Sequence, residues 1–218
     1  MSNKINMLNI CYNDDDCIEI GVDEVGRGPM FGRVYAAAVI LPKDNSFDHF
    51  KMKDSKKFHS KKKIKEVADY IKMNAIAWNI AWEDEKVIDE INIRNATHSA
   101  MHKAIKNLYT NKDTLLLVDG NDFKPVVVFR NNSLEQIPHV SIEGGDNKYT
   151  SIAAASILAK VERDEYIKEL CNEYNFLVER YDLNNNKGYG TKKHMEGIHK
   201  YGITEWHRKS FGICKSFS

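Results

Sequence analysis

The sequence predicts a single α/β domain built on a mixed sheet of five strands flanked by helices. Three observations carry this prediction. Apolar residues alternate with other residues over 17–23, a continuous apolar run covers 33–41, and later segments repeat their apolar residues every three to four positions. These are the patterns of a half-buried strand, of a strand buried on both faces and of amphipathic helices. Strands that come first and then alternate with helices are typical of an α/β fold.

Five strands are expected along the chain. They cover residues 17–23, 33–41, 75–82, 114–119 and 139–142. The connection between the first two is too short to hold a crossover helix, so we expect this pair to be antiparallel.

Helices are expected over residues 60–73, 92–109 and 150–174. The first is rich in lysine, and the second places its apolar residues on one stripe. The third begins with small residues, Ala153 to Ser156, which allow a neighbouring element to approach closely.

Composition limits the class of protein. The 218 residues fit one ordinary domain, and 42% hydrophobic with 29% charged residues is enough apolar material for a core. No apolar run approaches the 18 or so residues of a membrane span, and the N-terminus lacks the apolar segment of a secretory signal. Four cysteines form no CxxC pair and fit free thiols in a reducing compartment. We therefore expect a soluble, cytoplasmic protein with no membrane partner, and we take a monomer as the default because the sequence carries no signal of oligomeric state.

The net charge of +1 conceals two basic segments. Eight lysines and one acid lie between Lys51 and Lys65, and seven basic residues and two acids lie between Lys187 and the end of the sequence. Segregation of this kind is typical of a face that binds a polyanion. A solvated, lysine-rich helix surface produces the same pattern, so charge alone leaves both interpretations open.

Four carboxylates stand where buried elements are expected to end. Asp23 and Glu24 close the first strand, Asp119 closes the fourth, and Asp146 follows two glycines just before the long helix. Adjacent strand residues point to opposite faces, so Asp23 and Glu24 converge only if the strand ends between or just after them. Singly, Asp146 also fits a helix cap, Asp119 a turn and Glu24 a solvated strand end. Gathered together, the four would demand a cation, and their oxygen ligands suit Mg²⁺ or Mn²⁺.

Six sequence blocks, in this order, resemble the ribonuclease HII family. They are GVDEVGRGPMFG (21–32), DSKKF (54–58), LVDGN (117–121), GGDNKYTSIAAASILAKVERD (144–164), KGYGTKKH (187–194) and HRKSFG (207–212). The resemblance covers residues 17–212, and its long blocks around Asp23 and Ala155 are the most specific.

The resemblance implies an RNase H-like fold with a small C-terminal helical part. It also implies a type 2 ribonuclease H, an endonuclease that hydrolyses the RNA strand of RNA–DNA hybrids. Family members cut 5′ of a ribonucleotide, including single ribonucleotides embedded in duplex DNA, and leave 3′-hydroxyl and 5′-phosphate ends. By motif position, the catalytic acids that bind two Mg²⁺ or Mn²⁺ ions fall on Asp23, Glu24, Asp119 and Asp146.

On this basis the chain divides into an acidic N-terminal extension over residues 1–16 and one catalytic domain of the ribonuclease HII type over 17–218. Residues 187–218 are expected to form a substrate-binding part. No glutamine-led aromatic peptide follows the HRKSFG block, so we expect no clamp-binding peptide.

The resemblance also implies substrate-binding residues. It places Gly26, Arg27 and Gly28 around the ribose 2′-hydroxyl and Tyr189 against the following deoxyribose. Candidate phosphate contacts in the matching blocks are Lys56, Lys57, Lys160 and Arg208. Tyr189 also fits a packed core position, and Lys160 also fits an ordinary lysine on a helix surface.

Two other function classes are considered. A non-catalytic protein that binds RNA–DNA hybrids would keep the fold and the basic face, but it has no need of four acids near a polyanion. Another RNase H-like nuclease that cuts only DNA would have no 2′-hydroxyl to recognise, and so no need of the GRG and KGY blocks.

Overall fold

The computed structural model describes residues 7–130 and 132–217. At its centre is a mixed five-stranded sheet with the strand order β3-β2-β1-β4-β7. The strands are β1 (Ile18–Val25), β2 (Val34–Ile40), β3 (Ala77–Glu83), β4 (Thr114–Asp119) and β7 (His139–Ile142). β1 is antiparallel to β2 and parallel to β4, which is in turn parallel to β7. The predicted fold class, the five strands and the antiparallel first pair are confirmed.

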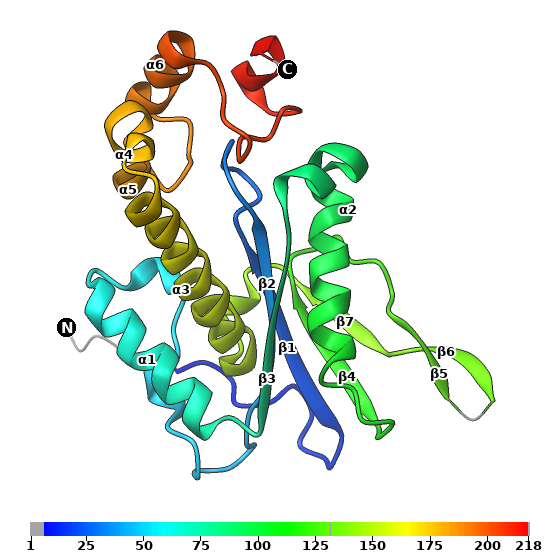
Figure 1. Cartoon of the computed structure of the whole chain (residues 1–218). Coiled ribbons are helices and arrows are strands. Elements are labelled where there is room, and N and C mark those ends of the chain that lie inside the picture. The colour runs from blue at the N-terminus through cyan, green and yellow to red at the C-terminus, as the bar shows by residue number, and fades with distance from the viewer. Residues whose placement is uncertain (1–6, 131, 218) are drawn as a thin grey trace.

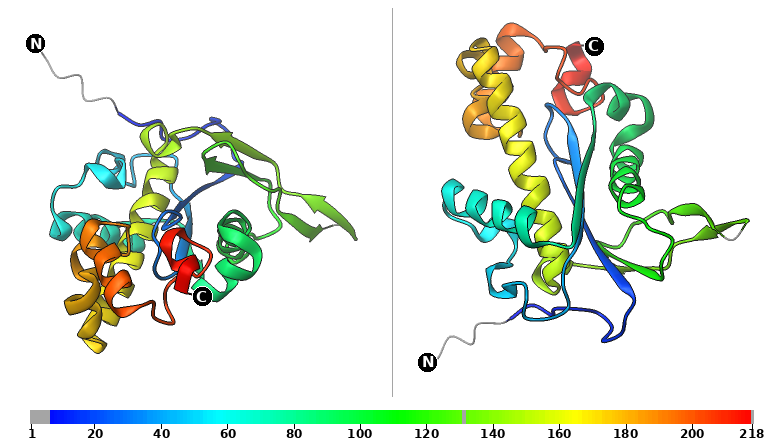
Figure 2. Two further views of the ribbon diagram at one scale, coloured as in Figure 1. Left: turned by 90° about the horizontal axis from the view of Figure 1, so that it is seen from above. Right: turned by 60° about the horizontal axis from the view of Figure 1, so that its bottom comes forward.

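Helices cover both faces of this sheet (Figures 1 and 2). α1 (Lys61–Asn74) and α3 (Thr150–Glu173) lie on one face, and α2 (Glu85–Lys106) lies on the other. α2 begins seven residues before the predicted helix, because the Asp84 side chain accepts the Val87 N–H and caps about two added turns. The predicted start coincides with Asn92, where φ is 66° and the helix kinks.

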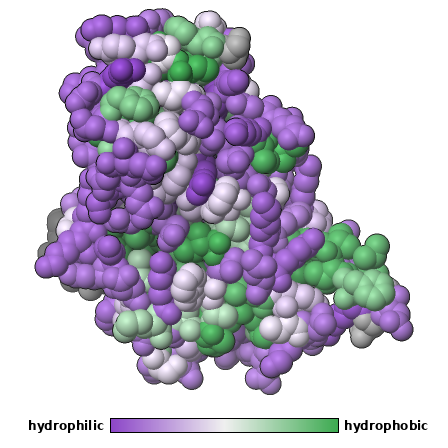
Figure 3. Space-filling view, viewed as in Figure 1, coloured by the Kyte–Doolittle hydropathy of each residue, from purple (hydrophilic) through white to green (hydrophobic). Residues whose placement is uncertain are grey.

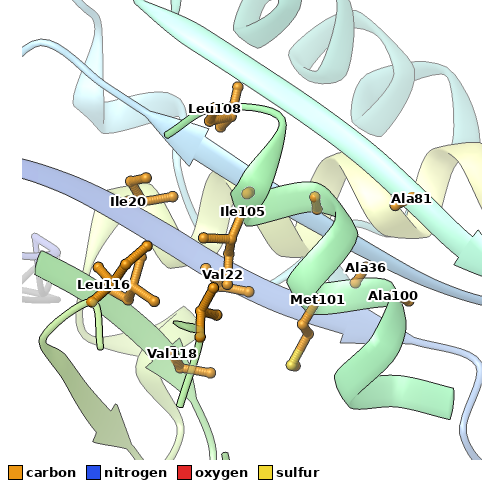
Figure 4. Close-up of a cluster of buried hydrophobic side chains, with 14 of the residues drawn as sticks. Ile20, Val22, Ala36, Ala81, Ala100, Met101, Ile105, Leu108, Leu116 and Val118 are labelled. Carbon is orange, nitrogen blue, oxygen red and sulfur yellow. The ribbon is translucent and has the colours of Figure 1, made fainter. Parts of the chain in front are cut away.

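Each face of the sheet has its own core. Figure 4 shows the core beneath α2, to which β1 contributes Ile20 and Val22 and α2 contributes Met101 and Ile105. Strand alternation turns Gly21 to the opposite face, where α3 crosses closely. A Cβ at position 21 would lie 2.2 Å from the Ser151 carbonyl carbon, so only glycine permits this approach.

A two-stranded hairpin that the sequence did not predict stands away from the sheet. Its strands are β5 (Val127–Arg130) and β6 (Ser133–Gln136). Each has only four residues, too few for a clear alternating pattern. Apolar side chains gather on it in Figure 3, where Phe129 and Leu134 are 66% and 75% exposed.

Residues just before β1 contact the rest of the domain. Asn9 forms an isolated bridge with Tyr149, and its carbonyl accepts the N–H of Thr150 at the start of α3. Glu19 of β1 accepts the backbone N–H groups of Tyr12 and Asn13. Residues 1–6 of the predicted N-terminal extension lie outside the described residues. Across the described ranges, no helix is long and apolar enough to cross a membrane.

Short helices complete the domain after α3. They are α4 (Phe176–Tyr181), α5 (Leu183–Asn186), α6 (Lys192–Tyr201) and the 3₁₀ segment η4 (Gly212–Phe217), and three earlier 3₁₀ segments are η1 (His49–Lys51), η2 (Ser55–Lys57) and η3 (Gly145–Asn147). The C-terminal segments form the predicted small helical part and pack around a third core with the end of α3. His194 and His207 are buried beside this core, with their Nε2 atoms 3.1 Å apart.

We expect acid to destabilise the fold through His207. Burial, reinforced by the neighbouring His194, lowers the pKa of His207 to about 3. Below its unfolded pKa of about 6.5, the unfolded chain binds a proton that the folded chain does not. The free energy of unfolding should therefore fall by about 2 kcal/mol between pH 6.5 and 5 from this group alone. Measured by urea unfolding, the free energy of unfolding of the His207→Asn variant should fall correspondingly less over this pH range. An equal fall in the variant and the wild type would contradict the prediction.

Candidate active site

The four carboxylates lie at the carboxyl ends of the parallel strands. β1, β4 and β7 are neighbours, so their carboxyl ends meet at one edge of the sheet. The pairing of Val22 with Val118 makes Asp23 and Asp119 the next residues on adjacent strands. Asp146 follows β7 within η3.

Asp23 is buried beneath α3, with 5% of its surface exposed. Its Oδ1 atom accepts the Glu24 N–H at 2.7 Å. Ser156 on α3 also donates to it, and the Ser156 hydroxyl lies 3.0 Å from that of Ser55. Burial raises the pKa of Asp23 well above its usual range, and the charges of Glu24 and Asp119 raise it further. The anion is therefore costly here without a cation.

Glu24 lies on the other face of β1. The strand ends one residue later, at Val25, and the chain turns at Gly26, whose φ is 94°. Glu24 lines a cavity of about 190 Å³ together with Asp119 and four residues of α2, among them Thr97 and Met101. Burial raises the pKa of Glu24, an effect opposed by Arg27, whose Nη1 is 3.4 Å from Oε1 of Glu24.

Asp119 and Asp146 are joined through the loop after β7. The N–H of Gly145 donates to Oδ1 of Asp119 at 2.6 Å. Asp146 is 6% exposed, and burial raises its pKa, as do Asp54 and Asp119. Asp146 does not cap α3, whose N-cap residue is Tyr149 and has no side-chain cap bond.

Residue Asn147 connects the DSKKF block to this edge. Its Nδ2 atom donates to Oδ1 of Asp146 at 3.0 Å and to Oδ2 of Asp54 at 3.3 Å. Asp54 was not among the four acids predicted from the sequence motifs. It comes close to Asp146 only through the fold.

The donor set fits a hard divalent cation. All four side chains supply carboxylate oxygens. Burial, with a smaller effect of the neighbouring acids, raises the pKa values of Asp23, Glu24 and Asp146, and a bound cation would oppose this. Within residues 7–130 and 132–217, no three acidic, histidine or cysteine side chains are close enough together to hold one ion. A bound ion would therefore require side-chain rotation or water ligands, and Mg²⁺ usually keeps several waters.

The GRG loop and Tyr189 lie side by side next to this edge. A Cβ at Gly28 would lie 3.5 Å from Cε1 of Tyr189. The Met30 N–H donates to the Gly188 carbonyl at 2.9 Å and so ties the two loops together. Tyr189 is 48% exposed, so it is not a packed core residue.

Arg208 does not contact phosphate in this fold, and the sequence-based prediction of such a contact is wrong. It is fully buried, and its guanidinium donates to four carbonyl oxygens of the GRG loop and the turn that follows. These are Gly26 at 2.6 Å, Pro29 at 2.7 Å, Gly32 at 2.8 Å and Arg27 at 3.1 Å. Arg208 therefore holds the GRG loop in place from its buried side.

Arg163 has a similar structural role that sequence reasoning missed. It is 1% exposed and donates to the carbonyls of Phe31, Arg33 and Lys187. The two buried arginines together hold the turn between β1 and β2 against the KGY loop. In the sequence, nothing distinguishes them from the arginines and lysines of the surface.

The predicted lysines have different surroundings. Lys56 and Lys57 are exposed on η2, and Lys56 is close enough to Asp146 to lower the pKa of that acid. Lys57 donates to Oδ1 of Asn147. Lys160 on α3 pairs with Asp164 at 2.5 Å and lines a cavity of about 350 Å³ with Lys61 and Lys187.

The chain matches the family model described as Ribonuclease HII over residues 20–214. It is 45% identical to the ribonuclease HII of Phocaeicola vulgatus over 204 residues, 93% of this chain and 92% of that protein. It is 46% identical to the ribonuclease HII of Parabacteroides distasonis over 202 residues, 93% and 94% of the two chains.

Solved structures share the fold at low sequence identity. The ribonuclease H2 of Pyrococcus horikoshii has a TM-score of 0.71 at 21% identity, covering 91% of this chain and 96% of that one. The ribonuclease HII of Archaeoglobus fulgidus, solved in complex with PCNA, gives 0.69 at 22%, covering 89% and 95%. A Bst-RNase HIII structure with Mn²⁺ gives 0.59 at 14%, covering 89% and 71%. These likenesses confirm the RNase H-like fold.

The family match spans nearly the whole chain and includes all four acids, the GRG loop and the KGY loop. The curated relatives cover it at 45% and 46% identity. This chain belongs to the ribonuclease HII family and is a type 2 ribonuclease H.

Proposed function

We propose that the enzyme cuts 5′ of a ribonucleotide, in RNA–DNA hybrids and at single ribonucleotides embedded in duplex DNA, leaving 3′-hydroxyl and 5′-phosphate ends. The observation that carries this proposal is the meeting of Asp23, Glu24, Asp119 and Asp146 at one sheet edge. The GRG loop follows Glu24 in the chain, its Arg27 pairs with Glu24, and Tyr189 lies against Gly28 of the same loop.

The acids are proposed to hold two divalent ions, Mg²⁺ or Mn²⁺. When bound, such ions supply an activated water and stabilise the leaving 3′-oxygen. Asp23 and Glu24 approach from the two faces of β1, while Gly145 fixes Asp119 through Oδ1. Asn147 orients Asp146 in the same way. The hydrogen bonds to Asp119 and Asp146 hold these two carboxylates at the edge of the sheet. Side-chain rotation or water ligands would complete the coordination of each ion.

Selection of RNA is assigned to the GRG loop and Tyr189. Gly28 is exposed, so a sugar can approach its backbone, whereas Gly26 is buried and a Cβ there would lie 2.4 Å from Nε of Arg163. The exposed Tyr189 ring offers a stacking surface beside Gly28. Arg27 pairs with Glu24 and so connects this loop to the carboxylates. We therefore propose that the 2′-hydroxyl is recognised next to the proposed cutting site.

A labelled RNA–DNA hybrid tests the chemistry. It would be incubated with Mg²⁺, with Mn²⁺ and with EDTA, and the product ends would be identified by polymerase extension and by a 5′-phosphate-dependent exonuclease. Metal-dependent cuts with extendable 3′ ends and 5′ phosphates are expected. Binding without cutting in either metal would favour a non-catalytic hybrid-binding protein, and cutting of the DNA strand would favour a different RNase H-like nuclease.

We expect duplex binding to weaken steeply with salt through Lys56 and Lys57. Each phosphate contact adds about one to the slope of log affinity against log salt concentration. Lys56→Ala should therefore reduce that slope by about 1, measured by fluorescence anisotropy in EDTA. Lys62→Ala is the matched control, since Lys62 is exposed at 86% on α1 and lies outside the matching blocks. Equal slopes for the wild type and Lys56→Ala would exclude this phosphate contact.

We propose the chain as a cytoplasmic monomer. The absence of a glutamine-led clamp peptide stays a prediction from the sequence, and the PCNA complex belongs to the Archaeoglobus protein.

A further inference from the structure

A chain of hydrogen bonds runs through the buried histidine pair to the backbone of Tyr189. The N–H of Thr204 lies 2.9 Å from Nδ1 of His207. Nε2 of His207 lies 3.1 Å from Nε2 of His194, and Nδ1 of His194 lies 3.0 Å from the Tyr189 carbonyl oxygen. The chain crosses from the segment after α6 to the KGY loop.

The direction of every bond in this chain is determined by its ends. A backbone N–H only donates, so Nδ1 of His207 accepts and its proton is on Nε2. That proton is then donated to Nε2 of His194, which leaves the proton of His194 on Nδ1. A carbonyl only accepts, so this last proton is donated to Tyr189. Both rings are neutral, and each has one tautomer.

The position of the Tyr189 ring depends on its backbone. No hydrogen bond of the Tyr189 hydroxyl is found in the described part of the chain, and the ring is exposed beside Gly28. Its carbonyl, in contrast, accepts from both Thr191 and His194. The preceding residue, Gly188, has a φ of 87° and donates its N–H to Asn186. We therefore expect the orientation of the Tyr189 ring to depend on the hydrogen bonds that its backbone carbonyl accepts.

We propose that His194 and His207 are positioning residues that fix Tyr189 for ribonucleotide recognition. This rests on the proposed function for the role of Tyr189, whereas the hydrogen-bond chain stands on its own geometry. His207 is adjacent to Arg208, which holds the GRG loop. Two adjacent residues therefore hold both parts of the proposed ribonucleotide surface. Arg208 holds the GRG loop directly, and His207 holds Tyr189 through His194.

Two substitutions at His194 separate positioning from general packing. In His194→Asn, the side-chain amide occupies the place of Nδ1 and still donates to the Tyr189 carbonyl. His194→Leu fills the space without a donor. We expect His194→Leu to lower kcat/KM on a duplex with one ribonucleotide about tenfold, which is about 1.4 kcal/mol. His194→Asn should stay within about threefold of the wild type.

A double-mutant cycle with Tyr189→Ala tests whether the effect passes through the tyrosine. In the Tyr189→Ala background, His194→Leu should change kcat/KM less than about twofold. Leu177→Ala is the stability control, because Leu177 is fully buried in the same core and makes no contact in the hydrogen-bond chain. It should lose stability without losing kcat/KM. A tenfold loss in Leu177→Ala, or an equal effect of His194→Leu in both backgrounds, would overturn the proposal.

A second measurement does not depend on activity. With 3-fluorotyrosine incorporated, the ¹⁹F resonance of Tyr189 is assigned by its loss in Tyr189→Phe. It should shift or broaden in His194→Leu and stay unchanged in His194→Asn and Leu177→Ala. An unchanged resonance in His194→Leu would overturn the positioning role. A wild-type enzyme that leaves the ribonucleotide uncut would instead overturn the proposed function, and the resonance would still decide the positioning role.

Discussion

The Asp119→Asn variant is expected to lose at least about 100-fold in cleavage rate and yet to be more stable than the wild type. Loss of a carboxylate that holds the ions removes several kcal/mol of transition-state stabilisation. Stability should rise by on the order of 1 kcal/mol, because the charge of Asp119 is one cause of the raised pKa of Asp23. The hydrogen bond from Gly145 survives, since the amide oxygen of Asn accepts it equally well.

Single-turnover cleavage and urea unfolding in EDTA measure the two effects. Asp113→Asn is the matched control, because Asp113 precedes the opposite end of β4 and its side chain is 88% exposed. Neither quantity should change appreciably in that variant. Full activity in Asp119→Asn would remove this carboxylate from the proposed ion site.

The Arg208→Met variant is expected to lose about 3–5 kcal/mol of unfolding free energy, a loss typical of breaking a buried charged network. Methionine fills similar space but leaves four buried carbonyls without the guanidinium that they share. The GRG loop should then relax, so cleavage should fall along with stability.

Urea unfolding and cleavage assays check this prediction. Arg208→Lys should fall between the wild type and Arg208→Met, because an ammonium has three donors and no fork to reach four carbonyls. Arg180→Met is the control. Arg180 is exposed and stacks on Phe176 and Tyr201, so its loss should cost no more than about 1 kcal/mol. Wild-type stability in Arg208→Met would contradict the structural role of Arg208.

Much of the sheet and of the acid cluster was accessible from the sequence. Alternation over β1 and the continuous apolar run of β2 predict strands directly, since burial on one face or both decides which positions are apolar. The acids were found because Asp119 and Asp146 are polar residues placed where buried elements stop. Strand adjacency then brings them to one edge.

The buried cations were not accessible in this way. Arg208 and Arg163 donate to backbone carbonyls. Every residue has a backbone carbonyl, so the sequence does not show which residues would accept these hydrogen bonds. A phosphate contact was predicted for Arg208 because it lies in a block that resembles the family, and no role was predicted for Arg163. The His194–His207 pair likewise joins residues whose meeting depends on the packing of the C-terminal segments.

The central claim is that one edge of the sheet both recognises a ribonucleotide and cuts beside it. A labelled DNA duplex with one ribonucleotide, compared with an all-DNA duplex in Mg²⁺, Mn²⁺ and EDTA, tests it most directly. We predict a single cut 5′ of the ribonucleotide that requires the metal, with the all-DNA duplex intact. Equal cutting of the all-DNA duplex, or no cutting of either in both metals, would contradict the claim.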